Sequence, residues 1–230
     1  MIADADIAAV GALVGDRARA SMLLALMGGD AVSAGELARR AGVTPSGATA
    51  HLWRLRDGGL VTGEVVGRQR VFQLAGPDVA EALEALSLVA PPLPARGLRQ
   101  SRAAAALKQA RTCYDHLAGE FGLAVTEALV EREVLAPENG RFAVTGPGRL
   151  WLGDLGVDVD ALERKPRSFA RSCLDWSERR PHLAGSLGAG VATAFFARGW
   201  VRRRPGGRAI AVTAAGADWL EGNLGVEGLR

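Results

Sequence analysis

Apolar residues between positions 33 and 57 recur at the 3.6-residue spacing of two short helices. Ser33 and Glu36 have the S-x-x-E spacing of a capping box, which predicts that a helix begins directly after Ser33. Gly42 can adopt the left-handed conformation that ends a helix. Thr44 and Pro45 predict a second start, because threonine caps helices and proline suits the first helical position. The apolar face of this second helix consists of Ala48, Leu52 and Leu55.

A β-hairpin is predicted directly after the two helices. Gly58 and Gly59 stop the second helix. Two short runs then follow, Leu60–Val66 and Gln69–Leu74, and Gly67 and Arg68 join them. The order of helix, tight turn, helix and basic hairpin predicts a winged helix-turn-helix.

The outward face of the second helix carries hydroxyl and arginine side chains. Such side chains can reach base edges and phosphates in the major groove, and arginines on the hairpin can meet the flanking backbone. A solvated, arginine-bearing helix in another kind of small helical domain is the alternative interpretation. The candidate DNA-binding residues are Thr44, Ser46, Thr49, His51, Arg54, Arg68 and Arg70.

The segment V-T-P-S-G-A-T-A-H-L-W-R-L-R-D-G-G-L-V resembles the recognition helix of the ArsR/SmtB family of bacterial winged-helix repressors. The upstream segment G-D-R-A-R-A-S-M-L-L-A-L resembles the opening of that family's domain, so the resemblance covers residues 5 to 90. It implies a homodimer that binds an inverted-repeat operator in double-stranded DNA and releases it when a signal arrives. It also implies a DNA-facing role for His51, and a dimer interface formed by the first helix and by residues 77–89.

Both metal sites known in many members of that family are missing from their usual places. The helix before the turn reads E-L-A-R-R-A and has no Cys-x-Cys element. The last helix of the domain reads G-P-D-V-A-E-A-L-E-A-L and has no histidine. A signal would therefore be received elsewhere in the chain.

Composition adds little to this picture. The chain has 230 residues, of which 48% are hydrophobic, so it can bury a core in one large or two modest domains. It has no apolar run of membrane-spanning length and its acidic start is unlike a signal peptide, so we expect a cytoplasmic protein without a membrane partner. The formal charge of +3 supports DNA binding less than the placement of the arginines does.

The second half of the chain repeats itself. A Pro-rich linker at residues 91–100 separates a DNA-binding and dimerisation domain at 1–90 from an effector domain at 101–230. In the effector domain His116-Leu117-Ala118-Gly119 returns as His182-Leu183-Ala184-Gly185, and later matches follow in order at a spacing of about 66 to 68 residues. We expect a helix from Ser101 to Ala118 and two winged-helix-like repeats, at about 101–160 and 168–228. A plain helical domain with a hairpin or two is the alternative.

Cysteine and histidine occur at matched places in the two repeats. If the repeats pack face to face, two sulfur and two nitrogen ligands converge, which suits zinc or another soft or borderline ion in a tetrahedral site. The residues are Cys113, His116, Cys173 and His182, with Asp115 and Asp175 as supporting carboxylates.

Three further interpretations of these residues stay open. The two cysteines can form a redox switch, or they can pack as small apolar side chains. Aromatic residues can instead line an apolar pocket for an organic effector; the candidates are Tyr114, Trp151, Phe169 and Trp176.

Taken together, the sequence predicts a mainly α protein with small β-hairpin wings, an α+β fold. It contains none of the common nucleotide-binding, hydrolase or metalloprotease motifs, so we expect no enzyme. The predicted function is sequence-specific transcriptional regulation of ArsR type, as a repressor, with a signal sensed by the second half. A protein-interaction adaptor built on winged helices and a thiol enzyme are the alternatives from other classes.

Overall fold

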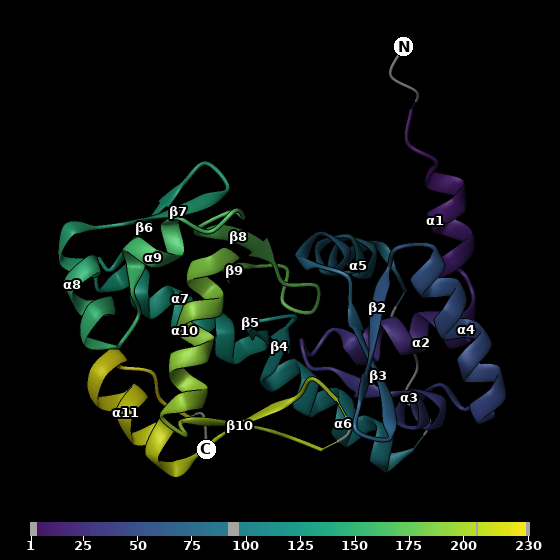
Figure 1. Cartoon of the computed structure of the whole chain (residues 1–230). Coiled ribbons are helices and arrows are strands. Elements are labelled where there is room, and N and C mark those ends of the chain that lie inside the picture. The colour runs from purple at the N-terminus through teal and green to yellow at the C-terminus, as the bar shows by residue number, and fades with distance from the viewer. Residues whose placement is uncertain (1–3, 92–96, 206, 229–230) are drawn as a thin grey trace. The chain divides into compact units, whose positions relative to one another are not determined.

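The computed structural model describes residues 4–91, 97–205 and 207–228, and its chain divides into two compact units, 1–83 and 84–230 (Figure 1). The expected boundary near residue 90 lies close to this division. Residues 92–96 of the expected Pro-rich linker lie outside the described residues. None of the described helices is long and apolar enough to cross a membrane.

The N-terminal unit is a winged helix, as the sequence predicts. A three-stranded antiparallel sheet of order β1-β3-β2 accompanies its helices, and β2 and β3 form the wing. The helix α5 (Pro77–Val89) follows and spans the division between the units. The elements are α1 (Ile7–Val14), α2 (Arg17–Leu26), β1 (Val32–Ser33), α3 (Ala34–Ala41), α4 (Pro45–Asp57), β2 (Val61–Val66) and β3 (Gln69–Leu74).

Local capping sets the boundaries of the two central helices. The Ser33 hydroxyl accepts a hydrogen bond from the Glu36 backbone N–H, and Thr44 does the same for Gly47. Gly42 ends α3 at φ +68°, a conformation that costs a residue with a side chain more than it costs glycine. The predicted apolar face of α4 is fully buried, at Ala48, Leu52 and Leu55.

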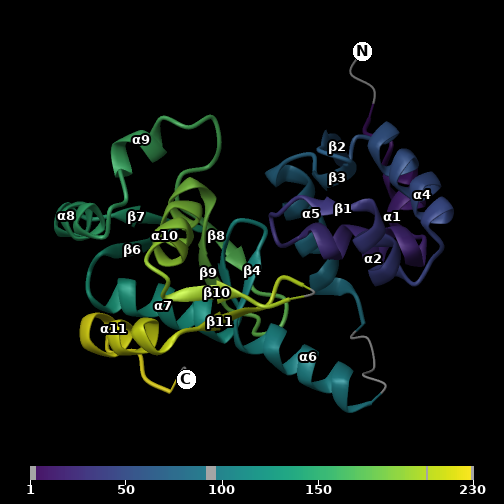
Figure 2. The ribbon, with the colours of Figure 1, turned by 60° about the horizontal axis from the view of Figure 1, so that its bottom comes forward.

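The C-terminal unit alternates hairpins and helices (Figures 1 and 2). Its strands form a four-stranded sheet of order β6-β7-β8-β9 and the separate hairpins β4–β5 and β10–β11. Its helices are α6 (Leu98–Gln109), α7 (Gly119–Glu131), α8 (Gly146–Asp154), α9 (Val159–Glu163), α10 (Gly185–Ala197) and α11 (Ala214–Leu224). Its strands are β4 (Arg111–Cys113), β5 (His116–Ala118), β6 (Leu135–Glu138), β7 (Arg141–Val144), β8 (Arg171–Leu174), β9 (Pro181–Ala184), β10 (Val201–Arg203) and β11 (Ile210–Val212).

The expected helix from Ser101 to Ala118 is wrong over its second half. The helix α6 ends at Gln109, and the chain then forms the hairpin β4–β5, which turns at Tyr114 with φ +59°. All three residues of β4 and all three of β5 are buried. A helix continued through this segment would bury only one side of it, so burial on both faces overrides the helical propensity of the alanine-rich stretch before it.

The matched segments share an order of elements. Hairpin β4–β5, helix α7, hairpin β6–β7 and helix α8 are followed by hairpin β8–β9, helix α10, hairpin β10–β11 and helix α11, with α9 as an addition between them. The winged-helix character of each segment is therefore limited to one long helix and the hairpin after it. The helix that we expected at the start of the first repeat is present as α6 but is shorter, whereas the start of the second repeat forms the hairpin β8–β9 instead of a helix.

Glycines recur in both segments because backbone lies against them. Gly119 and Gly185 begin α7 and α10 at φ +75° and +79°. A Cβ atom at Gly122 would lie 2.5 Å from the Leu117 carbonyl oxygen, and one at Gly188 would lie 2.7 Å from the equivalent oxygen of Leu183. A side chain at Gly122 or Gly188 would displace the strand that precedes the helix, and one at Gly119 or Gly185 would collide with the backbone of Lys108 or of Phe169.

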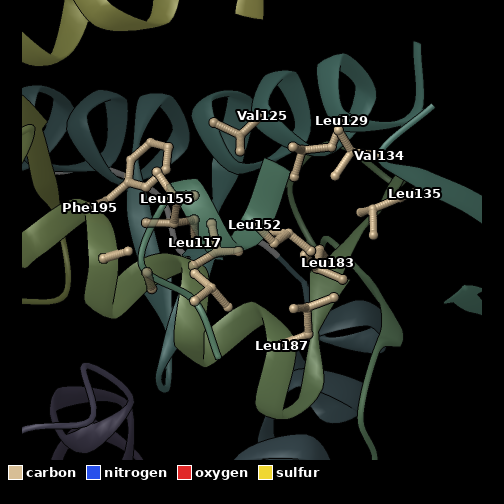
Figure 3. Close-up of a cluster of buried hydrophobic side chains, with 14 of the residues drawn as sticks. Leu117, Val125, Leu129, Val134, Leu135, Leu152, Leu155, Leu183, Leu187 and Phe195 are labelled. Carbon is tan, nitrogen blue, oxygen red and sulfur yellow. The ribbon is translucent and has the colours of Figure 1, made fainter. Parts of the chain in front are cut away.

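One hydrophobic core holds the C-terminal unit together (Figure 3). Leu117 and Leu183, each directly after a histidine, point into this core. Side chains from α7, α8 and α10 pack around them, with Val125, Leu152 and Leu187 among them. The core therefore holds β5 and β9, the two strands that carry the histidines, through Leu117 and Leu183.

Candidate functional site

The predicted DNA-binding face of α4 is open to solvent. Thr44, Ser46, Thr49 and Arg54 are exposed. The Thr49 hydroxyl donates a hydrogen bond to the Pro45 carbonyl oxygen over 3.0 Å. Threonine methyl groups suit contact with thymine methyl groups in the major groove. The face thus offers hydroxyl, methyl and guanidinium groups at the N-terminal and middle turns of the helix.

His51 is less exposed than the other candidate residues on α4. Its side chain is only 24% exposed, and its Nδ1 lies 3.7 Å from the Oδ1 of Asp16, beyond hydrogen-bonding distance. Asp16 caps α2 by accepting from the Arg19 backbone N–H. His51 therefore sits at the junction between α4 and the start of α2, where it can help to orient the helix as well as touch DNA.

The wing is tied to α4 by an aromatic side chain that our list of DNA-binding residues lacks. The Trp53 ring lies under two guanidinium groups, Arg56 at 3.8 Å and Arg70 at 4.8 Å from the ring centre. Trp53 and Arg56 are three residues apart on α4, so the sequence alone could have predicted that their side chains meet on one face of the helix. Arg70 comes from β3, and its approach depends on how the wing folds back. The Trp53 ring thus holds Arg56 of α4 and Arg70 of the wing close to each other.

The cysteine and histidine of each segment face each other across a hairpin. Cys113 pairs with His116 between β4 and β5, and Cys173 pairs with His182 between β8 and β9. Residues directly opposite on antiparallel strands project on the same side, about 4.5 to 5.5 Å apart at Cβ. The sequence spacings differ because β4–β5 turns within two residues whereas β8–β9 has a longer loop. The pairing is nevertheless the same.

The two hairpins bring all four side chains into one cluster. Strand β5 packs beside β9 (Figure 1), and the rings of His116 and His182 lie 5.1 Å apart. One ligand atom from each of Cys113, His116, Cys173 and His182 lies within 4.8 Å of all the others. None of the four side chains is more than 4% exposed. We call this group the Cys–His cluster.

Asp115 supports the cluster from its edge. Its carboxylate accepts a hydrogen bond from Arg167 over 2.5 Å, and its Oδ1 lies 3.4 Å from the Nδ1 of His116. Burial disfavours the charged imidazole, but the Asp115 carboxylate and the Cys173 sulfur together outweigh it and raise the pKa of His116. The Nε2 atom of His116 is buried and has no hydrogen-bond partner among the described residues. Asp115 therefore fixes the ring and leaves Nε2 for the cluster.

The two thiols of the cluster have pKa values shifted in opposite directions. The neighbouring Cys113 thiol, followed by His116 and His182, lowers the pKa of Cys173 to about 2. The pKa of Cys113 is raised by its hydrogen bond to Cys173 and by its burial. Cys173 is thus the more acidic of two thiols in a nearly solvent-free site, and the one that more readily forms a thiolate. Such a thiolate can bind a metal ion or react with an oxidant.

Asp175 is the centre of a polar network beside the cluster. Its carboxylate accepts hydrogen bonds from Arg111 at 2.6 Å and from the Gly119 backbone N–H at 2.8 Å. Ser177 donates through both its backbone and its hydroxyl. The Oδ2 atom lies 3.8 Å from the Nδ1 of His182, too far for a direct hydrogen bond. Asp175 therefore anchors the loop after β8 and the start of α7. Our sequence interpretation missed Arg111, whose partner is 64 residues away.

Two of the four aromatic candidates for an effector pocket, Trp151 and Trp176, have different neighbours. Trp151 packs against Trp219, with ring centres 6.1 Å apart, and Trp176 lies under the Arg111 guanidinium. The cavity between α7 and α10 is lined by Leu117, Gly122, Val125, Thr126, Leu183, Gly188 and Val191, and by none of the four aromatics.

Comparison with known proteins identifies the family. The chain is 40% identical over 222 residues to the HTH-type transcriptional regulator YdfF of Bacillus subtilis (strain 168), covering 96% of this chain and 98% of that one. Residues 14–64 match the model of a helix-turn-helix domain, a range that contains α2, α3 and α4. The chain belongs to the HTH-type transcriptional regulators. It is thus a DNA-binding regulator and not an enzyme, and the ArsR/SmtB resemblance agrees with this assignment.

Two solved structures match over a smaller part of this regulator. The cadmium metal-sensor CMTR from Mycobacterium tuberculosis is 33% identical over 39% of this chain and all of its own, at a TM-score of 0.32. The winged helix-turn-helix domain Mb0332 from Mycobacterium bovis, a possible ArsR-family regulator, is 26% identical over 39% of this chain and 89% of its own, at a TM-score of 0.34. We draw no argument from similarities at these scores.

Proposed function

We propose that this regulator is a homodimeric repressor of ArsR type that binds an inverted-repeat operator through α4 and the β2–β3 wing. The observation that carries the proposal is the division of α4 into two faces. Ala48, Leu52 and Leu55 are fully buried, while Ser46, Thr49 and Arg54 are exposed. A helix so divided is fixed in the domain by one face and offers the other to the major groove.

The wing supports this assignment with charge. Arg68 and Arg70 are exposed on the hairpin, and Trp53 ties Arg70 to α4. Guanidinium groups on a wing meet phosphates beside the groove that the recognition helix enters. Phosphate contacts fix the register of the protein on DNA, and α4 then distinguishes bases.

A second copy of the chain is the partner that fits the exposed apolar helices. The helix α1 reads I-A-A-V-G-A-L-V, and none of its residues is buried in the described chain. Ile7 is 74% exposed and Val10 is 41% exposed. On α5, Leu86 and Val89 are exposed as well. Apolar helices left open in one chain are typical of dimer interfaces, and the family resemblance assigns the interface to these same two helices.

The signal would be received in the C-terminal unit. The Cys–His cluster there combines two cysteine sulfurs and two buried imidazoles, so metal binding and thiol oxidation are its two available chemistries. The cavity between α7 and α10 is lined by none of the four aromatic candidates, which supports the cluster rather than an aromatic pocket as the sensor.

DNA binding by the purified full-length protein tests the operator proposal. We expect footprinting on the DNA upstream of its own coding region to show two protected half-sites, about one helical turn apart. Light scattering should give twice the chain mass of 24.0 kDa. Affinity should fall steeply with added salt, because phosphate contacts release counterions. Weak binding to every duplex without salt dependence would instead favour a protein-interaction adaptor.

A promoter–reporter strain tests the sensing part. Derepression by zinc or cadmium salts supports metal sensing, and derepression by a thiol oxidant such as diamide supports redox sensing. A reporter that stays repressed under both treatments, while the operator is bound, argues against a sensor at the cluster.

A further inference from the structure

We propose that the Cys–His cluster binds one tetrahedral metal ion of the zinc class through Cys113, His116, Cys173 and His182. This deepens the proposed function by naming the ligand of the C-terminal unit, but its test needs no DNA. The donor set of two sulfurs and two imidazole nitrogens suits zinc, cobalt(II) or cadmium and disfavours magnesium or calcium, which prefer oxygen.

The size of the cluster fits such an ion. Metal–sulfur bonds of about 2.3 Å and metal–nitrogen bonds of about 2.0–2.1 Å place tetrahedral ligand atoms roughly 3.3 to 3.8 Å apart. The four ligand atoms here all lie within 4.8 Å of one another. A contraction of about 1 Å at the widest pair, within reach of side-chain rotation, completes the tetrahedron.

Unpaired nitrogen atoms are the second, independent observation. The Nε2 atom of His116 and both ring nitrogens of His182 are buried without a hydrogen-bond partner among the described residues. An unsatisfied buried polar atom destabilises the folded state, so clustering three of them in one place is unfavourable without a ligand. A metal ion bound at one nitrogen of each ring satisfies two of these three atoms at once.

The surroundings resemble those of a protein metal site. Asp115 lies 3.4 Å from the Nδ1 of His116, the arrangement in which a carboxylate orients a ligating histidine. Arg167 in turn holds Asp115. On the other side, Asp175 lies near the Nδ1 of His182 and is fixed by Arg111. Each imidazole thus has a carboxylate on its Nδ1 side, and Nε2 is the nitrogen left to ligate.

The ion would join the two hairpins β4–β5 and β8–β9. Each hairpin contributes one cysteine and one histidine, so neither can form the site alone. Loading and removal of the ion would therefore change how firmly β5 is held against β9. Because the four side chains are almost fully buried, we expect slow exchange with chelators rather than rapid equilibrium.

Metal content of the full chain, purified under reducing conditions without chelator, tests the proposal. Mass spectrometry should find about one zinc ion per chain, and the two thiols should not titrate until the protein is denatured. Replacing zinc with cobalt(II) should give the intense visible bands of tetrahedral cobalt together with thiolate charge-transfer absorption.

Single-residue variants distinguish loss of the metal site from loss of folding. Cys173→Ser and His182→Gln should each lower the bound zinc at least tenfold, and circular dichroism should confirm that the variants are folded. His51→Gln is the matched control, because His51 is the third of the three histidines and lies outside the cluster, and it should keep its zinc. Wild-type protein that takes up no zinc or cobalt(II) when both are supplied in excess, with both thiols titrating, would overturn the proposal. So would a folded His182→Gln variant with unchanged cobalt spectra.

Discussion

Arg111 and Asp175 form an ion pair at 2.6 Å in which neither side chain has any exposed surface. The pair joins β4 to the loop after β8, and the Asp175 carboxylate also receives the first N–H of α7. Asp175→Asn leaves the Arg111 guanidinium buried without a counter-charge. Removing one partner of a buried pair destabilises a protein by about 3–5 kcal/mol. Urea denaturation monitored by circular dichroism should show this loss.

The control for this substitution is an exposed aspartate. Asp154→Asn makes the same chemical change at the end of α8, where the side chain faces solvent, and should alter stability by less than about 0.5 kcal/mol. Equal midpoints for Asp175→Asn and Asp154→Asn would show that the ion pair contributes nothing to stability.

The same carboxylate predicts a pH dependence. Burial acts to raise the pKa of Asp175, but the Arg111 guanidinium and the surrounding N–H donors hold it well below the ordinary value of 3.8. A carboxyl group with a depressed pKa in the folded state adds stability above its unfolded pKa and loses it as pH falls toward the folded value. The free energy of unfolding should therefore drop below about pH 4. The drop should be smaller in Asp175→Asn, and identical slopes would refute this origin.

Gly122 and Gly188 should not tolerate even a methyl group. A Cβ atom at either position meets a strand carbonyl oxygen closer than any normal contact. Gly122→Ala and Gly188→Ala should each destabilise the C-terminal unit by about 1–3 kcal/mol through overpacking. Gly153→Ala on α8 is the matched control, since nothing lies within 4 Å of its added Cβ. It should be neutral or stabilising by up to about 1 kcal/mol. The melting temperatures of the three variants distinguish the cost of a steric clash from the gain in helix propensity when glycine is replaced by alanine.

Trp53 should matter to DNA binding without touching DNA itself. Its ring holds Arg56 and Arg70, and each exposed cation–π contact is worth about 0.5–1 kcal/mol. Trp53→Ala should weaken operator binding several-fold, because the wing arginine is no longer placed beside α4. Trp53→Phe keeps an aromatic face and should lose less. Fluorescence anisotropy at one salt concentration compares them, and equal affinities for Trp53→Ala and wild type would show that the ring does not organise the wing.

The N-terminal unit was predictable because its signals are local. Ser33, Gly42 and Thr44 define helix ends within a few residues, and the hairpin follows from Gly67 between two short runs. The buried face of α4 follows from spacing alone. Its junction with the wing does not, because the contact of Arg70 with Trp53 depends on the fold of the hairpin.

The C-terminal unit was harder to predict because its contacts are long-range. Repeated motifs indicated that Cys113, His116, Cys173 and His182 occupy matched places, and the structure brings them together. Periodicity could not show that β4 and β5 are strands, since three buried residues carry no clear repeat. It also could not show the Arg111–Asp175 pair, whose members lie 64 residues apart and belong to no shared motif.

Operator binding by Arg54→Ala tests most directly whether α4 reads DNA. If Arg54 contacts a base, its loss should cost about 1–3 kcal/mol, which weakens the affinity about 5- to 150-fold. Arg132→Ala removes the same charge from an exposed position at the end of α7 and should bind like the wild type. Anisotropy titrations of all three proteins on the footprinted operator, with folding checked by circular dichroism, decide the matter. Wild-type affinity in a folded Arg54→Ala protein would contradict the assignment of α4 as the recognition helix.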